Sequence, residues 1–310
     1  MLESGRKSHD LRRRRITAVP SLLSGLPIAR PARMAVVAVA ACVTAMPALA
    51  GETEFTAAYT ARLAVLPINF ASGTLKATVP DKGRYVVDFG ADGMGFAMSG
   101  KAIGTVYPDG VWPLSAAIDT ADSSEVRKIR IALSRGRVRR DTVTPPLPYR
   151  PDRVPVTQEH KKGVIDPISA LLMPVAKKSD TLEPSVCDRT LPIFEGTERF
   201  DIKMSYLRIE NVKTIKGYEG PVVVCRATYK AIAGHRANGK PNYMEQNKTI
   251  EAWLAPIQGT QMVAPWKISL VTGMGTMLIE ASEFTATQNP TKHADAGEAV
   301  AAPSDNGTPR

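Results

Sequence analysis

The sequence predicts an all-β protein with mostly antiparallel strands, and two features between positions 52 and 287 support this. Apolar and polar side chains alternate with a period of two, as in a sheet with one buried face and one wet face. Turn-forming residues separate the alternating segments about every ten positions, which is typical of a meander, sandwich or barrel-like sheet. The clearest segment is residues 199–207, whose apolar side carries Phe200, Ile202, Met204 and Tyr206.

Strand-like segments follow one another along almost the whole of this region. The expected strands are residues 55–65, 68–79, 84–89, 125–133, 199–207, 221–229, 248–255, 261–271 and 276–284. Residues 80–83 (Pro-Asp-Lys-Gly) supply a turn, because the proline is preset for the bend and the glycine is free to take positive φ. Residues 273–275 make the last tight turn.

One short helix and one long connection interrupt the strands. The helix is expected at residues 166–172, where Asp166 can cap the first turn. Residues 142–163 contain five prolines among charged residues, which prevents a continuous strand, so we expect a surface connection within a single domain of residues 51–287. Residues 288–310 lack apolar periodicity and are expected to form a disordered tail.

The first fifty residues have the pattern of a secretory signal. They carry eight of the 40 basic and two of the 30 acidic residues, so only +4 of the formal +10 charge lies beyond position 50. The apolar run at residues 34–46 is shorter than the roughly 20 residues of a membrane span. Pro47 breaks the run, and Ala48 and Ala50 stand where signal peptidase reads. We expect cleavage after Ala50, export to the periplasm and no transmembrane segment in the mature chain.

Other interpretations of the leader stay open. Residues 39–42 (Val-Ala-Ala-Cys) loosely fit the box before a lipidated cysteine, which would anchor the protein to a membrane through Cys42. The arginines at residues 12–15 suggest a twin-arginine exporter, although they lie far from the apolar run. The basic region before Met34 is long, so translation starting at or near Met34 is a third alternative.

Cysteine usage agrees with export. Cys42 leaves with the signal, and the mature chain keeps Cys187 and Cys225. An even pair in an oxidising compartment predicts a disulfide, with two separate buried thiols as the alternative. A bridge closing a loop of about 38 residues would stabilise the fold by roughly 3–4 kcal/mol on the chain-entropy account. No metal site is expected, since neither a CxxC spacing nor neighbouring histidines accompany the pair.

No catalytic constellation stands out, and no cofactor is expected. His235 is the one histidine inside the strand pattern and lacks a Gly-x-Ser-x-Gly elbow, so we interpret it as a loop residue. Acids cluster just after the first mature cysteine, which suggests either a carboxylate pair for hydrolysis or a solvated strand face with interspersed Arg and Lys. These acids are Asp188, Glu195, Glu198 and Asp201. Gly90, Gly93 and Gly95 lack the GxGxxG register of a phosphate-binding loop and are interpreted as turn glycines.

The densest basic stretch of the mature chain is residues 127–140. It suggests contact with anionic lipid head groups or other envelope polyanions, or more simply a solvated strand face. Because nucleic-acid binding needs a more concentrated stripe, no nucleic-acid partner is expected.

Several segments resemble a known family. Residues 187–201 (CDRTLPIFEGTERFD), a second cysteine at Cys225 and residues 231–236 (AIAGHR) are similar to the alphaproteobacterial branch of a periplasmic family, domain of unknown function 3108. Residues 166–171 (DPISAL) resemble that family's short helix motif. The resemblance implies a long curved sheet or open barrel, similar to lipoprotein carriers and to disulfide-bearing envelope-integrity proteins. It implies no catalytic residues, and only Cys187 and Cys225 carry over, as a structural bridge.

These features favour a non-enzymatic periplasmic protein that binds or scaffolds in support of cell-envelope integrity. A curved sheet can hold a lipid, a lipidated protein or a peptide strand. The candidate ligand-facing residues are Phe200, Ile202, Met204 and Tyr206. A partner-binding structural module without a small ligand is one alternative. An envelope glycan or peptide hydrolase using the clustered acids or His235 is another.

Overall fold

The computed structural model describes residues 51–66, 68–80, 83–107, 110–175, 182–237, 243–247 and 249–290. Within them, fifteen strands belong to a single sheet. The strands are β1 (Gly51–Leu63), β2 (Asn69–Pro80), β3 (Gly83–Gly93), β4 (Phe96–Tyr107), β5 (Gly110–Asp122), β6 (Val126–Ser134), β7 (Arg137–Thr144), β8 (Met173–Pro174), β9 (Thr190–Phe194), β10 (Arg199–Lys213), β11 (Lys216–Gly217), β12 (Glu219–Ala233), β13 (Ile250–Ile257), β14 (Met262–Thr272) and β15 (Gly275–Pro290). Short helical turns accompany them: η1 (Glu159–Lys161), η2 (Ser169–Leu171), η3 (Pro184–Cys187) and α1 (Tyr243–Gln246). The expected leader lies outside the described residues, as do residues 291–310 of the expected tail.

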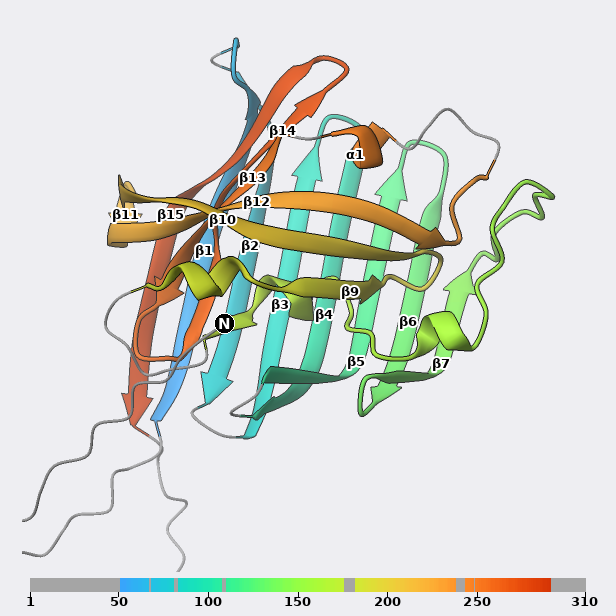
Figure 1. The fold of residues 1–310 in the computed structure, drawn as a ribbon, viewed down its shortest axis with the longest axis horizontal. Coiled ribbons are helices and arrows are strands. Elements are labelled where there is room, and N and C mark those ends of the chain that lie inside the picture. The colour runs from blue at the N-terminus through green and yellow to red at the C-terminus, as the bar shows by residue number, and fades with distance from the viewer. Residues whose placement is uncertain are drawn as a thin grey trace, which may run out of the picture. The chain divides into compact units, whose positions relative to one another are not determined.

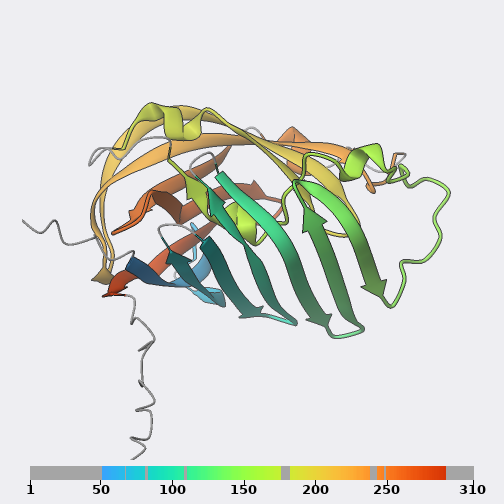
Figure 2. The same cartoon turned by 90° about the horizontal axis from the view of Figure 1, so that it is seen from below.

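The sheet consists of two meanders joined along their first and last strands. Its order is β7-β6-β5-β4-β3-β2-β1-β15-β14-β13-β12-β10-β9, so β1 lies between β2 and β15. The pairs along this path are antiparallel, and Gly51 at the start of β1 is opposite Pro290 at the end of β15. Figures 1 and 2 show the long strands β10 and β12 crossing over the face of β3 to β7. The predicted fold class, a long curved antiparallel sheet, is confirmed.

The alternation expected from the sequence decides which side chains are buried. In β6, Ile129, Ile131 and Leu133 are buried, whereas Lys128, Arg130 and Ala132, which alternate with them, are exposed. This is the period of two that a strand with one wet face requires. The inward residues join an inner core that both meanders share, with Phe55 and Tyr85 among its largest fully buried side chains.

Strand β12 departs from alternation because both of its faces are covered. Val222 and Val224 belong to the inner core, and Val223 and Cys225 belong to a second cluster on the opposite face. We call this second cluster the disulfide cluster, since Cys187 in η3 is bonded to Cys225 within it. The predicted disulfide is therefore confirmed, with the two Cα atoms 5.5 Å apart.

The segment expected to be a short helix forms one 3₁₀ turn, η2. As predicted, Asp166 caps it: its Oδ1 accepts hydrogen bonds from the backbone N–H groups of Ile168 and Ser169, at 3.0 and 2.9 Å. The turn stops at once because Leu172 adopts an extended conformation that leads into β8. The segment lies against the inner face of the sheet, where the Tyr85 hydroxyl of β3 donates to Ser169 Oγ at 2.7 Å.

Three details differ from expectation. β15 continues three residues past the predicted boundary of 287, because Gln288, Asn289 and Pro290 pair with the start of β1. Gly90 lies inside β3, paired with Thr74, and only Gly95 of the three glycines interpreted as turn residues has positive φ. Strands β4, β5, β7 and β9 and the two-residue strands β8 and β11 were not located from the sequence.

Candidate functional site

The inner face of the sheet borders a cavity of about 550 Å³. Strands β1 to β6 form one wall and β14 and β15 form another, while the η2 segment closes the inner end. The cavity lies toward the edge of the sheet that carries the β1–β2, β3–β4 and β14–β15 hairpins. Phe96 and Met98 line it and are also exposed on the surface, so the cavity reaches solvent at that edge.

Small side chains in neighbouring strands explain why this part of the inner face is hollow. Gly73 on β2 is directly opposite Ala91 on β3. Tyr59 on β1 and Met98 on β4 flank this pair. Glycine and alanine have too little volume to fill the space that larger residues fill elsewhere in the core, so an apolar void remains.

The inner end of the cavity is closed by a close approach of η2 to β4. Ile168 is buried and lies over Gly100, where an added Cβ atom would come within 2.4 Å of Ile168 Cδ1. Only glycine leaves room for the isoleucine at this point. Leu171 from the same turn also lines the cavity.

Glu195, in the turn between β9 and β10, is the one carboxylate or cation among the described residues that line the cavity. The Thr197 hydroxyl donates a hydrogen bond to its Oε1. Burial raises the pKa of the Glu195 carboxyl, and the neighbouring charge of Glu198 raises it further. A carboxyl with a raised pKa retains its proton more readily and can then donate a hydrogen bond as well as accept one.

None of the four candidate ligand-facing residues lines this cavity. Met204 and Ile202 pack in the disulfide cluster, and Phe200 stacks on Tyr229 with ring centroids 5.0 Å apart. Tyr206 is opposite Cys225 and is exposed. These side chains therefore face the side of the sheet opposite the cavity. The prediction failed because alternation identifies the two faces of a strand without telling which one borders a cavity.

The residues that do line the cavity were missed in the sequence. Their signal is a glycine or alanine in place of a large inward residue, as at Gly73, Ala91 and Gly100. Such a signal becomes readable only when the pairing of strands is known, since one small residue alone also fits a turn or a bulge.

The clustered acids do not converge on one site. Glu195 and Glu198 share a turn, in which the Glu195 N–H donates to the Glu198 carbonyl at 3.1 Å. Asp201 forms an ion pair with Arg199 at 2.7 Å, and Asp188 is exposed. His235 follows β12, and its carbonyl accepts the Val154 N–H at 2.8 Å.

Across the described part of the chain, no group of three or more His, Cys, Asp and Glu residues is arranged to hold a metal ion.

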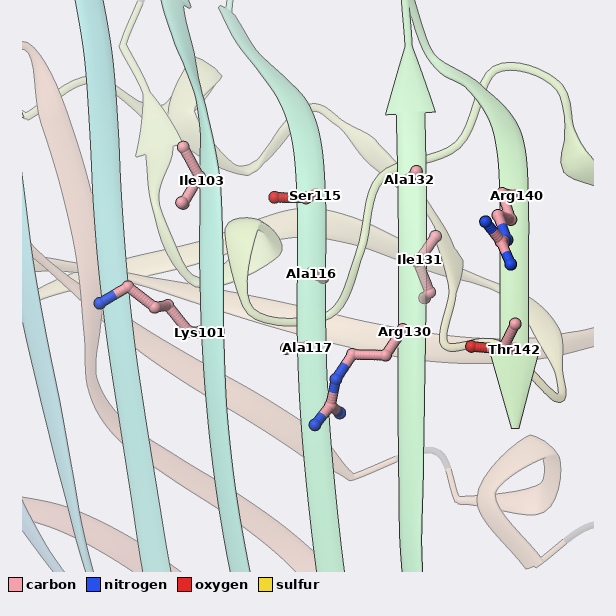
Figure 3. A pocket seen from close by; sticks show the side chains of 10 residues that line it. All are labelled: Lys101, Ile103, Ser115, Ala116, Ala117, Arg130, Ile131, Ala132, Arg140 and Thr142. Carbon is pink, nitrogen blue, oxygen red and sulfur yellow. The ribbon is translucent and has the colours of Figure 1, made fainter. Parts of the chain in front are cut away.

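A second hollow of about 460 Å³ lies on the outer face of β4 to β7, and Figure 3 shows the side chains that line it. Its floor has small residues such as Ser115, Ala117 and Ala132, and Lys101, Arg130 and Arg140 surround it. Lys101 pairs with Asp88 on β3 at 3.0 Å, and Arg130 points over β5 to Asp119. Within the basic stretch at 127–140, Arg130 thus pairs with an acid of the adjacent strand, as on a solvated strand face.

Comparison with known proteins gives a distant structural match and a family. A crystal structure described as a beta-barrel-like protein of domain of unknown function DUF1849 from Brucella abortus aligns with 77% of this chain and 98% of its own, at 10% identity and a TM-score of 0.38. No curated protein matches the chain. In the part that the structure describes, no helix has the length and apolar character needed to cross a membrane.

The sequence pattern of one family matches residues 54–282, which include nearly all the strands and every residue named above as lining the cavity. The chain belongs to the family described as protein of unknown function (DUF3108).

Proposed function

We propose that this protein is a non-enzymatic binding protein of the bacterial periplasm whose inner cavity holds the apolar chain of an envelope lipid or lipidated protein. The observation that carries the proposal is the cavity of about 550 Å³, walled by apolar side chains and small residues. Its volume falls within the roughly 300–1,000 Å³ of small-molecule sites, which are likewise mostly apolar with a few placed polar groups.

Glu195 is the polar group that would orient such a ligand. Its raised pKa favours the neutral carboxyl, which can donate a hydrogen bond to an ester, amide or hydroxyl oxygen at the head of an acyl chain. An ionised carboxylate without a partner would oppose the entry of an apolar chain, because charge is costly to bury. The proposed ligand is therefore an amphiphile with one hydrogen-bonding end.

Two features support the compartment. The leader has the basic, apolar and small-residue regions of a signal peptide. The disulfide between Cys187 and Cys225 is the kind of bond that persists in oxidising compartments such as the periplasm.

The test begins with the exported chain purified from the periplasm. Native mass spectrometry followed by solvent extraction should find a lipid or acylated peptide at near-stoichiometric level. The delipidated protein should then bind a fluorescent fatty acid in solution. An Ala91→Trp variant, which fills the cavity from β3, should lose this binding.

The matched control is Ala97→Trp on the neighbouring strand, where the residue is exposed and lies on the outer side of β4. It adds the same ring without touching the cavity, so fatty-acid binding should be retained. Equal binding by wild type and both variants would contradict a ligand site in this cavity. A protein that carries no ligand and takes up no fatty acid would support a partner-binding scaffold instead.

A further inference from the structure

Exposed apolar side chains gather on the hairpins at one edge of the sheet. They come from the β1–β2, β3–β4, β5–β6 and β14–β15 hairpins, which successive turns of the two meanders place at the same edge (Figure 1). We call them the rim residues: Val65, Leu66, Ile68, Met94, Phe96, Met98, Val126, Val271 and Met274. The most exposed are Met94 at 83%, Val65 at 79% and Met274 at 77%. Large exposed apolar surface that gathers in one place is unusual on a monomeric protein and marks an interaction site.

The rim is continuous with the cavity. Phe96 and Met98 belong to both, since they line the cavity and are 41% and 38% exposed. On the other wall, Met277 lines the cavity three residues after Met274 at the hairpin tip. An apolar ligand that leaves the cavity here passes directly onto whatever covers the rim.

Several of the charges beside the rim are paired with one another. Arg127 at the start of β6 pairs with Glu125. At the base of the β14–β15 hairpin, Glu280 lies 3.4 Å from Lys267 and 4.0 Å from Arg62 of β1. The rim therefore presents apolar side chains without a strong electrostatic field of either sign. Such a surface suits an uncharged, apolar partner rather than a polyanion.

We infer that this edge docks on the surface of a phospholipid bilayer, with the rim residues inserted among the lipid head groups and the cavity mouth against the lipid. Aliphatic, Met and Phe side chains at the tips of separate hairpins are suited to this, because apolar groups gain free energy at the boundary between head groups and acyl chains. The inference rests on the proposed function in one respect: an acyl chain could then move between bilayer and cavity without crossing water.

The test is flotation of the mature protein with vesicles of phosphatidylcholine, a neutral lipid. Wild type should float with the vesicles, and added salt should change this little. The variant Val65→Ser/Met94→Ser/Met274→Ser removes one highly exposed side chain from each of three hairpins and should lower vesicle partitioning at least about tenfold. The matched control is Tyr149→Ser/Ile215→Ser, which removes two side chains as exposed as these but outside the four rim hairpins, and should bind as wild type does.

The outcomes separate docking from ligand binding. Fatty-acid binding in vesicle-free solution should be equal in wild type and the rim variant. If neither protein binds the fatty acid but wild type still floats with vesicles, the proposed function is overturned and the docking inference is not. Wild type that stays unbound, or binds only anionic vesicles and is released by salt, would overturn docking. A wild-type dimer that the rim variant converts to a monomer would also overturn it, since the rim would then be an interface between copies of this chain.

Discussion

Asp166 is fully buried, yet its carboxylate has a partner for each oxygen. Oδ1 accepts the backbone N–H groups of Ile168 and Ser169, and Oδ2 accepts the Ser169 hydroxyl at 2.6 Å. Ser169 Oγ accepts in turn from the Tyr85 hydroxyl. Burial outweighs these hydrogen bonds and raises the pKa of the Asp166 carboxyl above its usual range.

This raised pKa predicts a pH-dependent stability. The folded protein holds a proton on Asp166 more tightly than the unfolded chain does, so protonation of Asp166 stabilises the folded state. This stabilisation is complete below the unfolded pKa of about 3.9 and is lost as the pH rises through the folded pKa. An Asp166→Asn variant cannot titrate there. In urea unfolding at a series of pH values from about 4 to about 8, the free energy of unfolding of wild type should fall relative to that of the variant. A difference that stays constant across this range would contradict the expectation.

Single residues were predictable where their partners are close in the chain. The capping role of Asp166 follows from a carboxylate placed before a short apolar turn. The contact between Tyr85 and Ser169 spans 84 positions, and nothing local indicates it. Glu195 was recognised as an acid in a cluster, but its place at the cavity depends on how the second meander lies over the first.

At the scale of elements, the fit of η2 against β4 controls the inner end of the cavity. A Gly100→Ala substitution would place a methyl group 2.4 Å from Ile168 Cδ1 and 3.2 Å from the Ala117 carbonyl oxygen. We expect it to lower the free energy of unfolding by about 1–3 kcal/mol through overpacking. Ile168→Val removes Cδ1 and by itself should cost about 0.5–1.5 kcal/mol.

Combining the two substitutions tests whether they meet as described. The Gly100→Ala/Ile168→Val double variant should be more stable than the sum of the single effects predicts, by about 0.5 kcal/mol or more. Denaturant unfolding of the four proteins gives this coupling energy. Additive effects would show that the methyl group added by Gly100→Ala is accommodated without contact with Ile168.

The disulfide connects η3 to β12, and both of its cysteines are fully buried. We therefore expect a reductant to leave the folded protein unchanged and to release two thiols only in urea. Reduction opens a loop of sequence separation 38. On the chain-entropy account it should lower the free energy of unfolding by about 4 kcal/mol. Thiol titration with and without urea measures the first point, and the unfolding midpoint measures the second; rapid release of thiols from the native protein would contradict the burial.

Strand positions were predictable, but the faces of the strands were not. Alternation located β6 and β10, and the proline and glycine turn separated β2 from β3. In β10 the apolar row around Met204 meets the disulfide cluster rather than the cavity. A strand covered on both sides, as β10 and β12 are over part of their length, has two apolar environments, and its own sequence does not distinguish them.

At the scale of the whole molecule, pairing between β1 and β15 joins the two meanders. The pairing extends from Gly51 with Pro290 to Leu63 with Met277, with one bulge between Ala58 and Tyr59. Local sequence patterns do not indicate contacts between the two ends of the domain, so the strand order could not be predicted from the sequence. The inner core nevertheless draws residues from both meanders, so neither buries its apolar face alone.

This closure predicts that the domain tolerates circular permutation. Gly51 and Pro290 are directly opposite on neighbouring antiparallel strands, so a short Gly/Ser linker can join them without distortion. New ends between Pro148 and Tyr149 fall in a segment outside the strands, where Tyr149 is 90% exposed. We expect a cooperative urea transition and a free energy of unfolding within about 1–2 kcal/mol of the unpermuted domain, because loop-closure entropy changes slowly with loop length.

A second permutant with the same linker supplies the control. Its ends lie between Val223 and Val224 of β12, two fully buried residues that face the disulfide cluster and the inner core respectively. Opening the chain there interrupts both clusters and should abolish cooperative unfolding. If the permutant opened at Tyr149 also failed to fold, the β1–β15 pairing would not suffice to hold the meanders together, and the covalent connection between β7 and η2 would be the more important link. If the permutant opened at Tyr149 folds and still binds the fluorescent fatty acid, the cavity depends on the pairing of the two meanders and not on their order along the chain.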